Sequence, residues 1–89
     1  MALSDWLVKT RLKRTERKLR RLRARQRQIR DKEEELQKEI RRGAATDETR
    51  ARAKKLHDEK EHMTHMINTL HADEERYRAE LKAAGIATH

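Results

Sequence analysis

The 89-residue sequence contains no cysteine and no proline, only two glycines, and a single tryptophan and tyrosine as its aromatic residues. Without cysteine the chain has neither disulfide bonds nor thiolate ligands for a metal ion. Without proline, nothing in its long charged stretches prevents a continuous helix. The scarcity of aromatic and β-branched residues disfavours a β-sheet. Together these absences favour an all-α protein.

Long hydrophobic runs are also missing. No apolar run approaches the ~20 residues that span a bilayer, and the N-terminus lacks the basic-then-apolar order of a signal peptide. Charged residues make up 45% of the chain and hydrophobic residues 34%, a balance that permits folding only if the apolar residues are regularly placed. We therefore expect a soluble intracellular protein of the cytoplasm, nucleoid or nucleus, or a virion component.

The apolar residues follow coiled-coil spacing in two segments. In the first, alternating steps of four and three residues lead through Val8, Leu12, Thr15, Leu19, Leu22, Gln26, Ile29, Glu33, Leu36 and Ile40. In the second, the same steps lead through Ala53, Leu56, Lys60, Met63, Ile67, Leu70, Glu74, Tyr77 and Leu81. Such heptad spacing is typical of helices that pack side by side. The sequence therefore predicts two helices that face each other.

Glycine and capping residues mark where these helices end. Gly43 and Gly85 suit the left-handed conformation that often follows a helix, while Ser4 and Thr46 can cap the helices that they precede. A loop as short as the one between Gly43 and Thr46 makes the helices antiparallel neighbours. We expect one helical-hairpin domain over residues 1–89, with helix one at about 4–42, the loop at about 43–46, helix two at about 47–84 and a tail at 85–89.

A turn centred near residues 44 and 45 also sets the register of the two seams. Leu22 then lies opposite Ile67, and most other layers likewise pair apolar residues. Glu33 and Lys60 fall one layer apart, and such buried polar residues can fix the register at some cost in stability. Because the seam of a lone hairpin is narrow, we expect self-association, most simply as two hairpins in a four-helix bundle.

The net charge of +8 is concentrated in one half of the expected hairpin. Residues 9–30 carry twelve Lys or Arg against one acid, Glu16, whereas the facing residues 59–80 carry six acids and three bases. The loop half is close to neutral. Like charges at three- and four-residue spacings repel one another on a helix. We therefore expect an anionic partner for helix one.

Nine of those twelve bases are arginine, whose planar guanidinium makes forked contacts to phosphate. Two aromatics provide no row of stacking platforms for unpaired bases, and no zinc finger or recognition-helix motif is present. We therefore expect a non-catalytic protein that binds duplex nucleic acid or structured RNA through phosphate, with little sequence preference. The residues expected to contact phosphate are Arg14, Arg17, Arg20, Arg21, Arg23, Arg25 and Arg27.

The alternative hypothesis is a structural or adaptor protein that docks on an acidic protein surface or assembles into a larger particle. Leu3, Trp6 and Leu7 lie at helical spacing outside the seam and would form its apolar anchor. Trp6 could instead fold over the C-terminal residues Ala84 and Ile86. The apolar patch is only about one turn long, so we do not expect membrane binding.

The histidines of helix two raise the question of a metal site. His57, Glu61 and His65 repeat at four-residue steps, a spacing that can hold a divalent ion. Exposed histidines beside acids are common on helices without metal, and no HExxH motif is present, so we expect neither metal nor cofactor. A two-helix hairpin offers no enclosed pocket, and nucleophile motifs and phosphate-binding glycine loops are missing. We therefore do not expect an enzyme.

Overall fold

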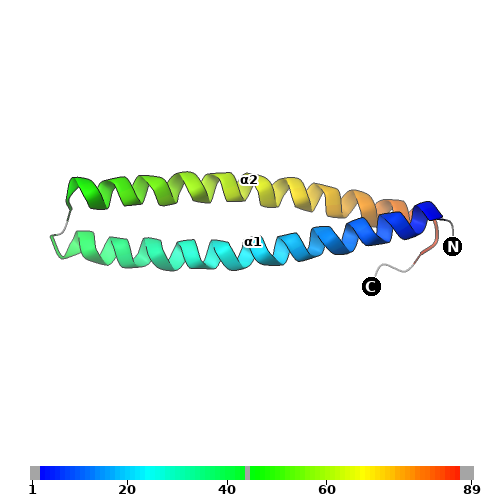
Figure 1. Cartoon of the computed structure of the whole chain (residues 1–89), viewed down its shortest axis with the longest axis horizontal. Coiled ribbons are helices and arrows are strands. Elements are labelled where there is room, and N and C mark those ends of the chain that lie inside the picture. Colours follow the sequence, from blue (N-terminus) through cyan, green and yellow to red (C-terminus); the bar gives the residue numbers. More distant parts are fainter. Residues whose placement is uncertain (1–2, 44, 87–89) are drawn as a thin grey trace.

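In the computed structural model the chain forms two long helices that lie side by side along their length (Figure 1). Helix α1 spans Leu3–Arg41 and helix α2 spans Asp47–Ala83. The structure describes residues 3–43 and 45–86, and this part of the chain contains no strand. The resulting rod measures 62 × 18 × 15 Å. The predicted all-α fold, a hairpin of two long helices, is confirmed.

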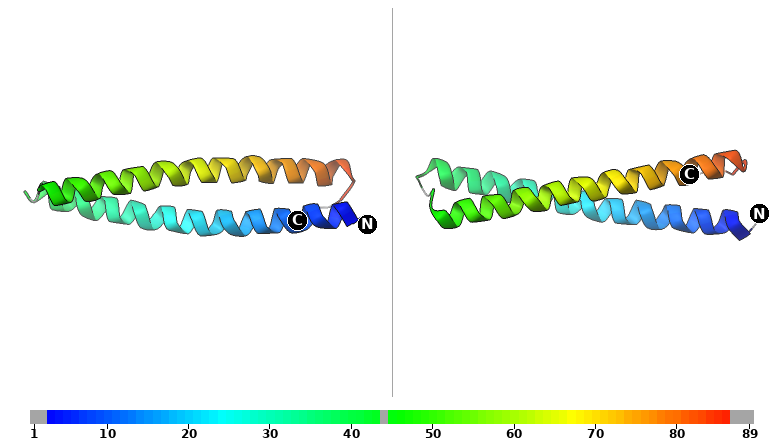
Figure 2. Two further views of the ribbon diagram at one scale, coloured as in Figure 1. Left: turned by 45° about the horizontal axis from the view of Figure 1, so that its top comes forward. Right: turned by 90° about the horizontal axis from the view of Figure 1, so that it is seen from above.

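The helices are antiparallel. The beginning of α1 lies beside the end of α2 at one end of the rod, and the connecting loop closes the other end (Figure 1). Seen from above, the helices cross at a shallow angle rather than running strictly parallel (Figure 2). A shallow crossing keeps two heptad seams in contact over many turns.

The loop is defined by its glycine and by a threonine cap. Gly43 has a φ of +90°, a conformation that residues with a Cβ adopt only with strain. The Thr46 Oγ1 accepts a hydrogen bond of 3.2 Å from the Thr49 backbone N–H, which caps α2 as expected. The Thr49 hydroxyl donates in turn to the Thr46 carbonyl at 2.8 Å. These contacts end α1 and start α2 within a few residues.

The far ends of the helices differ from each other. Gly85, with a φ of +74°, ends α2 as expected, and its N–H donates to the Lys82 carbonyl. The Ile86 N–H donates to the Leu81 carbonyl at 2.9 Å, which completes a Schellman motif. The prediction that Ser4 caps α1 is wrong, because the helix already begins at Leu3. Ser4 therefore lies inside the first turn.

The core is a single narrow seam between the helices. Its most deeply buried side chains are Ile29 and Leu81, each only 1% exposed. A central cluster joins Leu19 and Ile29 of α1 to Met63 and Ile67 of α2. All of these residues occupy the heptad positions that the sequence predicted. Burial of this apolar surface is therefore the main contribution that holds the two helices together.

Polar residues interrupt the seam at the places that the sequence indicated. The Glu33 Oε2 lies 3.6 Å from the Lys60 Nζ on the opposite helix, while the Glu33 Oε1 is buried without a hydrogen-bond partner. Thr15 is 7% exposed and its hydroxyl donates to the Arg11 carbonyl of the preceding turn. Because only one of its two oxygens has a partner, the Glu33 carboxylate adds little to the stability of the fold. It does disfavour helix registers in which Lys60 no longer lies beside it, since the buried charge would then have no partner.

Candidate nucleic-acid interface

The cationic residues of α1 fall into two groups according to the direction in which they point. When the seam is assigned to heptad positions a and d, positions b, c and f lie on the opposite side of α1 and face away from α2. Within residues 9–30, six bases occupy these positions. We call this set the outer basic face, and its members are Lys13, Arg14, Arg17, Arg20, Arg21 and Arg27.

All six side chains of the outer basic face are exposed. None of them has a hydrogen bond or an ion pair with any residue in the described parts of the chain. From Lys13 to Arg27 the face extends about 21 Å along the helix axis, at 1.5 Å per residue. The result is a straight row of cations without counter-charges, on the side of the rod that α2 does not cover.

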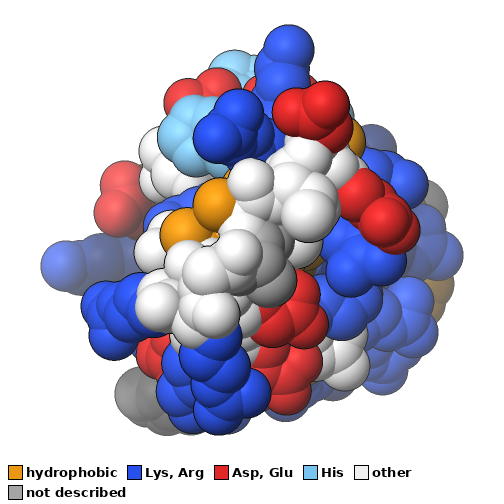
Figure 3. All heavy atoms as spheres, turned by 90° about the vertical axis from the view of Figure 1, so that its left-hand side faces the viewer, with side chains coloured by type: hydrophobic (Ala, Val, Ile, Leu, Met, Phe, Trp, Pro, Cys, Tyr) orange, Lys and Arg blue, Asp and Glu red, His pale blue; other side chains and the backbone are white. Residues whose placement is uncertain are grey.

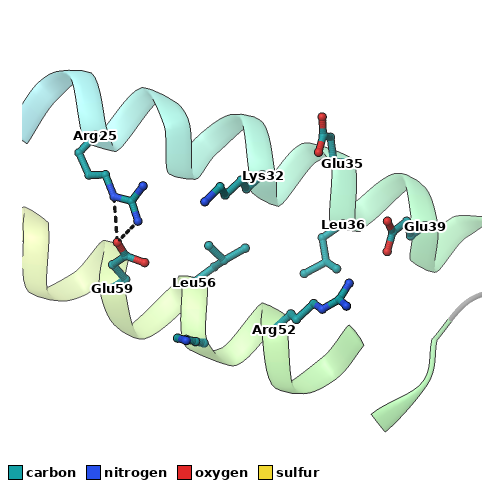
Figure 4. Close-up of a pocket in the computed structure, with 9 residues that line it drawn as sticks. Arg25, Lys32, Glu35, Leu36, Glu39, Arg52, Leu56 and Glu59 are labelled. Atoms are coloured by element: carbon teal, nitrogen blue, oxygen red, sulfur yellow. Dashed lines mark hydrogen bonds and ion pairs between the residues drawn. The ribbon is translucent and has the colours of Figure 1, made fainter. Parts of the chain in front are cut away.

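Two of the arginines predicted to contact phosphate instead join the helices. The Nε and Nη2 of Arg25 donate to the Glu59 Oε1 at 3.0 and 2.7 Å (Figure 4). The Arg25 Nη1 also donates to the Gln28 Oε1 at 3.2 Å. The Arg23 Nη2 lies 2.8 Å from the His71 Nε2. Both arginines occupy positions that flank the seam. Their guanidinium groups already have hydrogen-bond partners within the hairpin.

Arg76 and Arg78 of α2, in the same half of the hairpin, are also paired. The Arg78 Nη2 lies 3.5 Å from the Glu16 Oε1 of α1 and 3.6 Å from the Glu74 Oε2. Arg76 lies 3.6 Å from Asp73, and its hydrogen bond to the Tyr77 hydroxyl is the main cause of a raised pKa. Unbalanced positive charge is therefore a property of α1 and not of both helices.

The loop half of the rod presents charges of both signs. Figure 3 views the molecule from the loop end, and lysine and arginine side chains alternate there with aspartate and glutamate. Pairs such as Arg52 with Glu48, at 2.8 Å, balance one another locally. This surface therefore lacks the unbalanced row of cations found on α1.

The predicted apolar anchor is exposed where the structure describes it. Trp6 is 56% exposed and Leu7 is 42% exposed, both on the outward side of α1. Trp6 therefore does not fold over the end of α2 to any large extent. Leu3 belongs to the first turn of α1, but its side chain lies outside the described residues.

The histidines of α2 are not grouped with other metal-binding side chains among the described residues. His57 lies 3.0 Å from Glu61 on the next turn, and both side chains are largely exposed. Within residues 3–43 and 45–86, no group of three or more His, Cys, Asp or Glu side chains could hold a metal ion. In the same residues, neither helix has a stretch apolar and long enough to cross a bilayer.

Sequence reasoning left out one member of the outer basic face. Lys13 shares the outward side of α1 with Arg20 and Arg27, which follow it at intervals of seven residues. The heptad position of each base carries this information, because positions next to the seam reach the partner helix and outward positions do not. The same rule distinguishes Arg23 and Arg25 from the other five arginines.

Comparison with known proteins adds no relative. No protein-family model matches the chain, and no curated protein or solved structure shows significant similarity to it.

Proposed function

We propose that this helical hairpin binds duplex nucleic acid or structured RNA through phosphate, with little sequence preference. The observation that carries the proposal is the outer basic face of α1, where six exposed cations have no counter-charge among the described residues. Five of the seven arginines chosen from the sequence belong to it. Arg23 and Arg25 are assigned to the contact between the helices.

The pattern of pairing supports a polyanionic ligand. Carboxylates of the opposite helix neutralise Arg25, Arg78 and Lys60. Bases near the contact between the helices can therefore find an acid within the chain. No base of the outer basic face forms an ion pair with a described residue. A row of like charges about 21 Å long is costly unless an anion of similar length lies against it. The phosphate backbone of a nucleic acid is such an anion.

The shape of the rod is compatible with a duplex. A single helix with its side chains is about 10–12 Å across, close to the ~12 Å width of the major groove of B-DNA. The outer basic face points away from α2, so α1 can approach a duplex while α2 stays outside the groove. Phosphate contacts made in this way carry no information on sequence.

Fluorescence anisotropy tests the proposal. The protein is titrated into two labelled duplexes of unrelated sequence, each of ~20 base pairs, and into a labelled RNA hairpin at ~50 mM salt, where electrostatic attraction is strong. We expect all three to bind, with the two duplexes within about threefold of each other. Absence of binding at this salt concentration would exclude nucleic acid as the ligand.

A second function, as a structural or adaptor protein, is favoured by the exposure of Trp6. Large exposed aromatic side chains often anchor protein interfaces, and 56% of this one faces solvent. The substitution Trp6→Ala distinguishes the two functions. Under the nucleic-acid hypothesis we expect duplex affinity to change by less than about twofold, because charge carries the binding. Under the adaptor hypothesis, sedimentation velocity should show that an assembly formed by the native chain is lost.

A further inference from the structure

A shallow apolar groove follows one side of the hairpin, at right angles to the outer basic face. Its larger part, in the half of the rod away from the loop, has a volume of about 580 Å³. Leu22 of α1 and Met66 and Leu70 of α2 form its floor. Met66 is 39% exposed there, although it stands next to the buried seam. Apolar surface therefore remains uncovered at this point.

A second, separate hollow lies nearer the loop on the same side of the rod, and we call it the loop-side part of the groove. The second part has a volume of about 340 Å³, and Leu36 of α1 and Leu56 of α2 point into it (Figure 4). In both parts the lining residues come mainly from heptad positions c, d and g. The Arg25–Glu59 ion pair lines the loop-side part at the end nearer the larger one. From Leu22 to Leu36 the groove extends for about 21 Å.

The rim of the larger part is positively charged. Lys18 and Arg21 border it from α1 and His65 borders it from α2, and no described residue that lines it is acidic. One heptad further along, Arg25 has Glu59 as its partner across the helices. The register that pairs these two residues places Met66 opposite Lys18. Lys18 thus has Met66 opposite it, whereas Arg25, at the same position of the next heptad, has the Glu59 carboxylate opposite it.

We infer that this groove is a docking site for an acidic amphipathic helix of another protein, which would complete a three-helix bundle with α1 and α2. The occupant's apolar side chains cover Leu22, Met66 and Leu70, and its carboxylates pair with Lys18 and Arg21. A helix of about 15 residues covers both parts of the groove at 1.5 Å per residue. Methionine adapts its shape to such a partner more readily than branched side chains do.

Charge and polarity disfavour the other occupants. A second copy of this chain whose two-fold axis passes through the larger part would bring its own Lys18 and Arg21 against the same two residues, which repel one another. Nucleic acid gains little from a floor made of Leu22, Met66 and Leu70. An acidic helix suits both the floor and the basic rim of the larger part, whereas the loop-side part is lined by Glu35, Glu39 and Glu59 as well as by bases and presents charges of both signs. This inference does not depend on the proposed nucleic-acid function, because the groove and the outer basic face share only Arg21.

Methyl NMR of protein labelled with ¹³C at its methionine methyl groups tests the inference directly. Met66 reports on the groove, and Met63, which is 7% exposed in the seam, reports on whether the hairpin stays closed. The probe is a synthetic helical peptide of about 21 residues, with leucine at heptad positions a and d and glutamate at e and g. The control peptide has lysine in place of every glutamate.

We expect the acidic peptide to shift the Met66 signal while the Met63 signal stays in place, and to bind at least about tenfold more tightly than the lysine peptide. Met66→Glu should weaken binding at least about tenfold, because it places a repelling carboxylate in the groove next to Lys18. Ala72→Glu, an exposed site on the outward side of the same helix, adds the same charge and should have an effect of less than about threefold. Met66→Leu should preserve binding.

Several results would overturn the inference. One is an unchanged Met66 signal at millimolar peptide. Another is a joint shift of Met63 and Met66, because the peptide would then be replacing one of the helices. If Met66→Glu and Ala72→Glu weakened peptide binding equally, net charge alone would explain the loss and the groove would have no specific role. A Met66 shift that grows with protein concentration alone would make the occupant a second copy, and a shift caused only by a duplex would assign the groove to nucleic acid.

Discussion

Replacing Arg17, Arg20 and Arg21 together by glutamate should lower the affinity for a 20-base-pair duplex by about a hundredfold to a thousandfold at ~50 mM salt. Each phosphate contact contributes about 0.9 to the slope of log affinity against log salt, so three contacts contribute a slope of about 2.7. Between ~1 M and ~50 mM salt this slope corresponds to roughly three orders of magnitude in affinity. Reversed charges also repel the remaining phosphates. Fluorescence anisotropy measures the loss, and circular dichroism at 222 nm should show unchanged helicity because all three side chains are exposed.

A second triple variant controls for net charge. Lys38, Lys54 and Lys55 are exposed in the loop half, and Lys38, the one among them on α1, lies about 16 Å beyond Arg27 along the helix axis. Changing them to glutamate alters the total charge by the same amount as the Arg17, Arg20 and Arg21 variant. We expect a loss of less than about tenfold, because these residues lie away from the proposed contact and are screened by salt. Equal losses in both triple variants would mean that the face has no special role.

Replacing Ile29 by alanine should destabilise the hairpin by about 2–4 kcal/mol. Ile29 is 1% exposed and lies in the cluster with Leu19, Met63 and Ile67, so the change removes buried methyl groups and leaves a cavity. In a domain of this size each kcal/mol shifts the Tm by about 4–8 °C. We therefore expect the Tm, followed by circular dichroism, to fall by at least about 8 °C.

Leu7→Ala is the matched control for the stability prediction. Leu7 is an apolar residue on the same helix, but 42% of it is exposed. Its loss should cost less than about 1 kcal/mol, because little additional surface is returned to water. If Ile29→Ala changed the Tm no more than Leu7→Ala does, the seam between α1 and α2 would not be what holds the hairpin together.

The fold could be predicted from the sequence because the information that defines it is local. Steps of three and four residues between apolar positions indicated both seams, and residues such as Leu19 and Ile67 are buried accordingly. Gly43 and Thr46 marked the turn because a positive φ and a helix cap each require particular side chains. Ser4 does not mark the start of α1, because the helix begins at Leu3 and a helix can begin before a good capping residue.

The roles of individual arginines were harder to predict, because they depend on what lies opposite each residue. Arg21 and Arg25 belong to the same basic run, yet Arg21 faces solvent and Arg25 meets Glu59 on the other helix. Composition does not separate them. The difference arises from the heptad position of each residue combined with the register of the hairpin. The chemical nature of the partner is harder still, because guanidinium groups complement both phosphate and carboxylate.

The central claim, that the outer basic face of α1 lies along a phosphate backbone, is tested most directly by the salt dependence of duplex binding. Six contacts at ~0.9 each predict that log affinity falls against log salt with a slope of about −5. The variant in which Arg17, Arg20 and Arg21 are changed to alanine should show a slope of about −3. A slope shallower than about −2 in the native protein, or equal slopes in the two proteins, would contradict the claim.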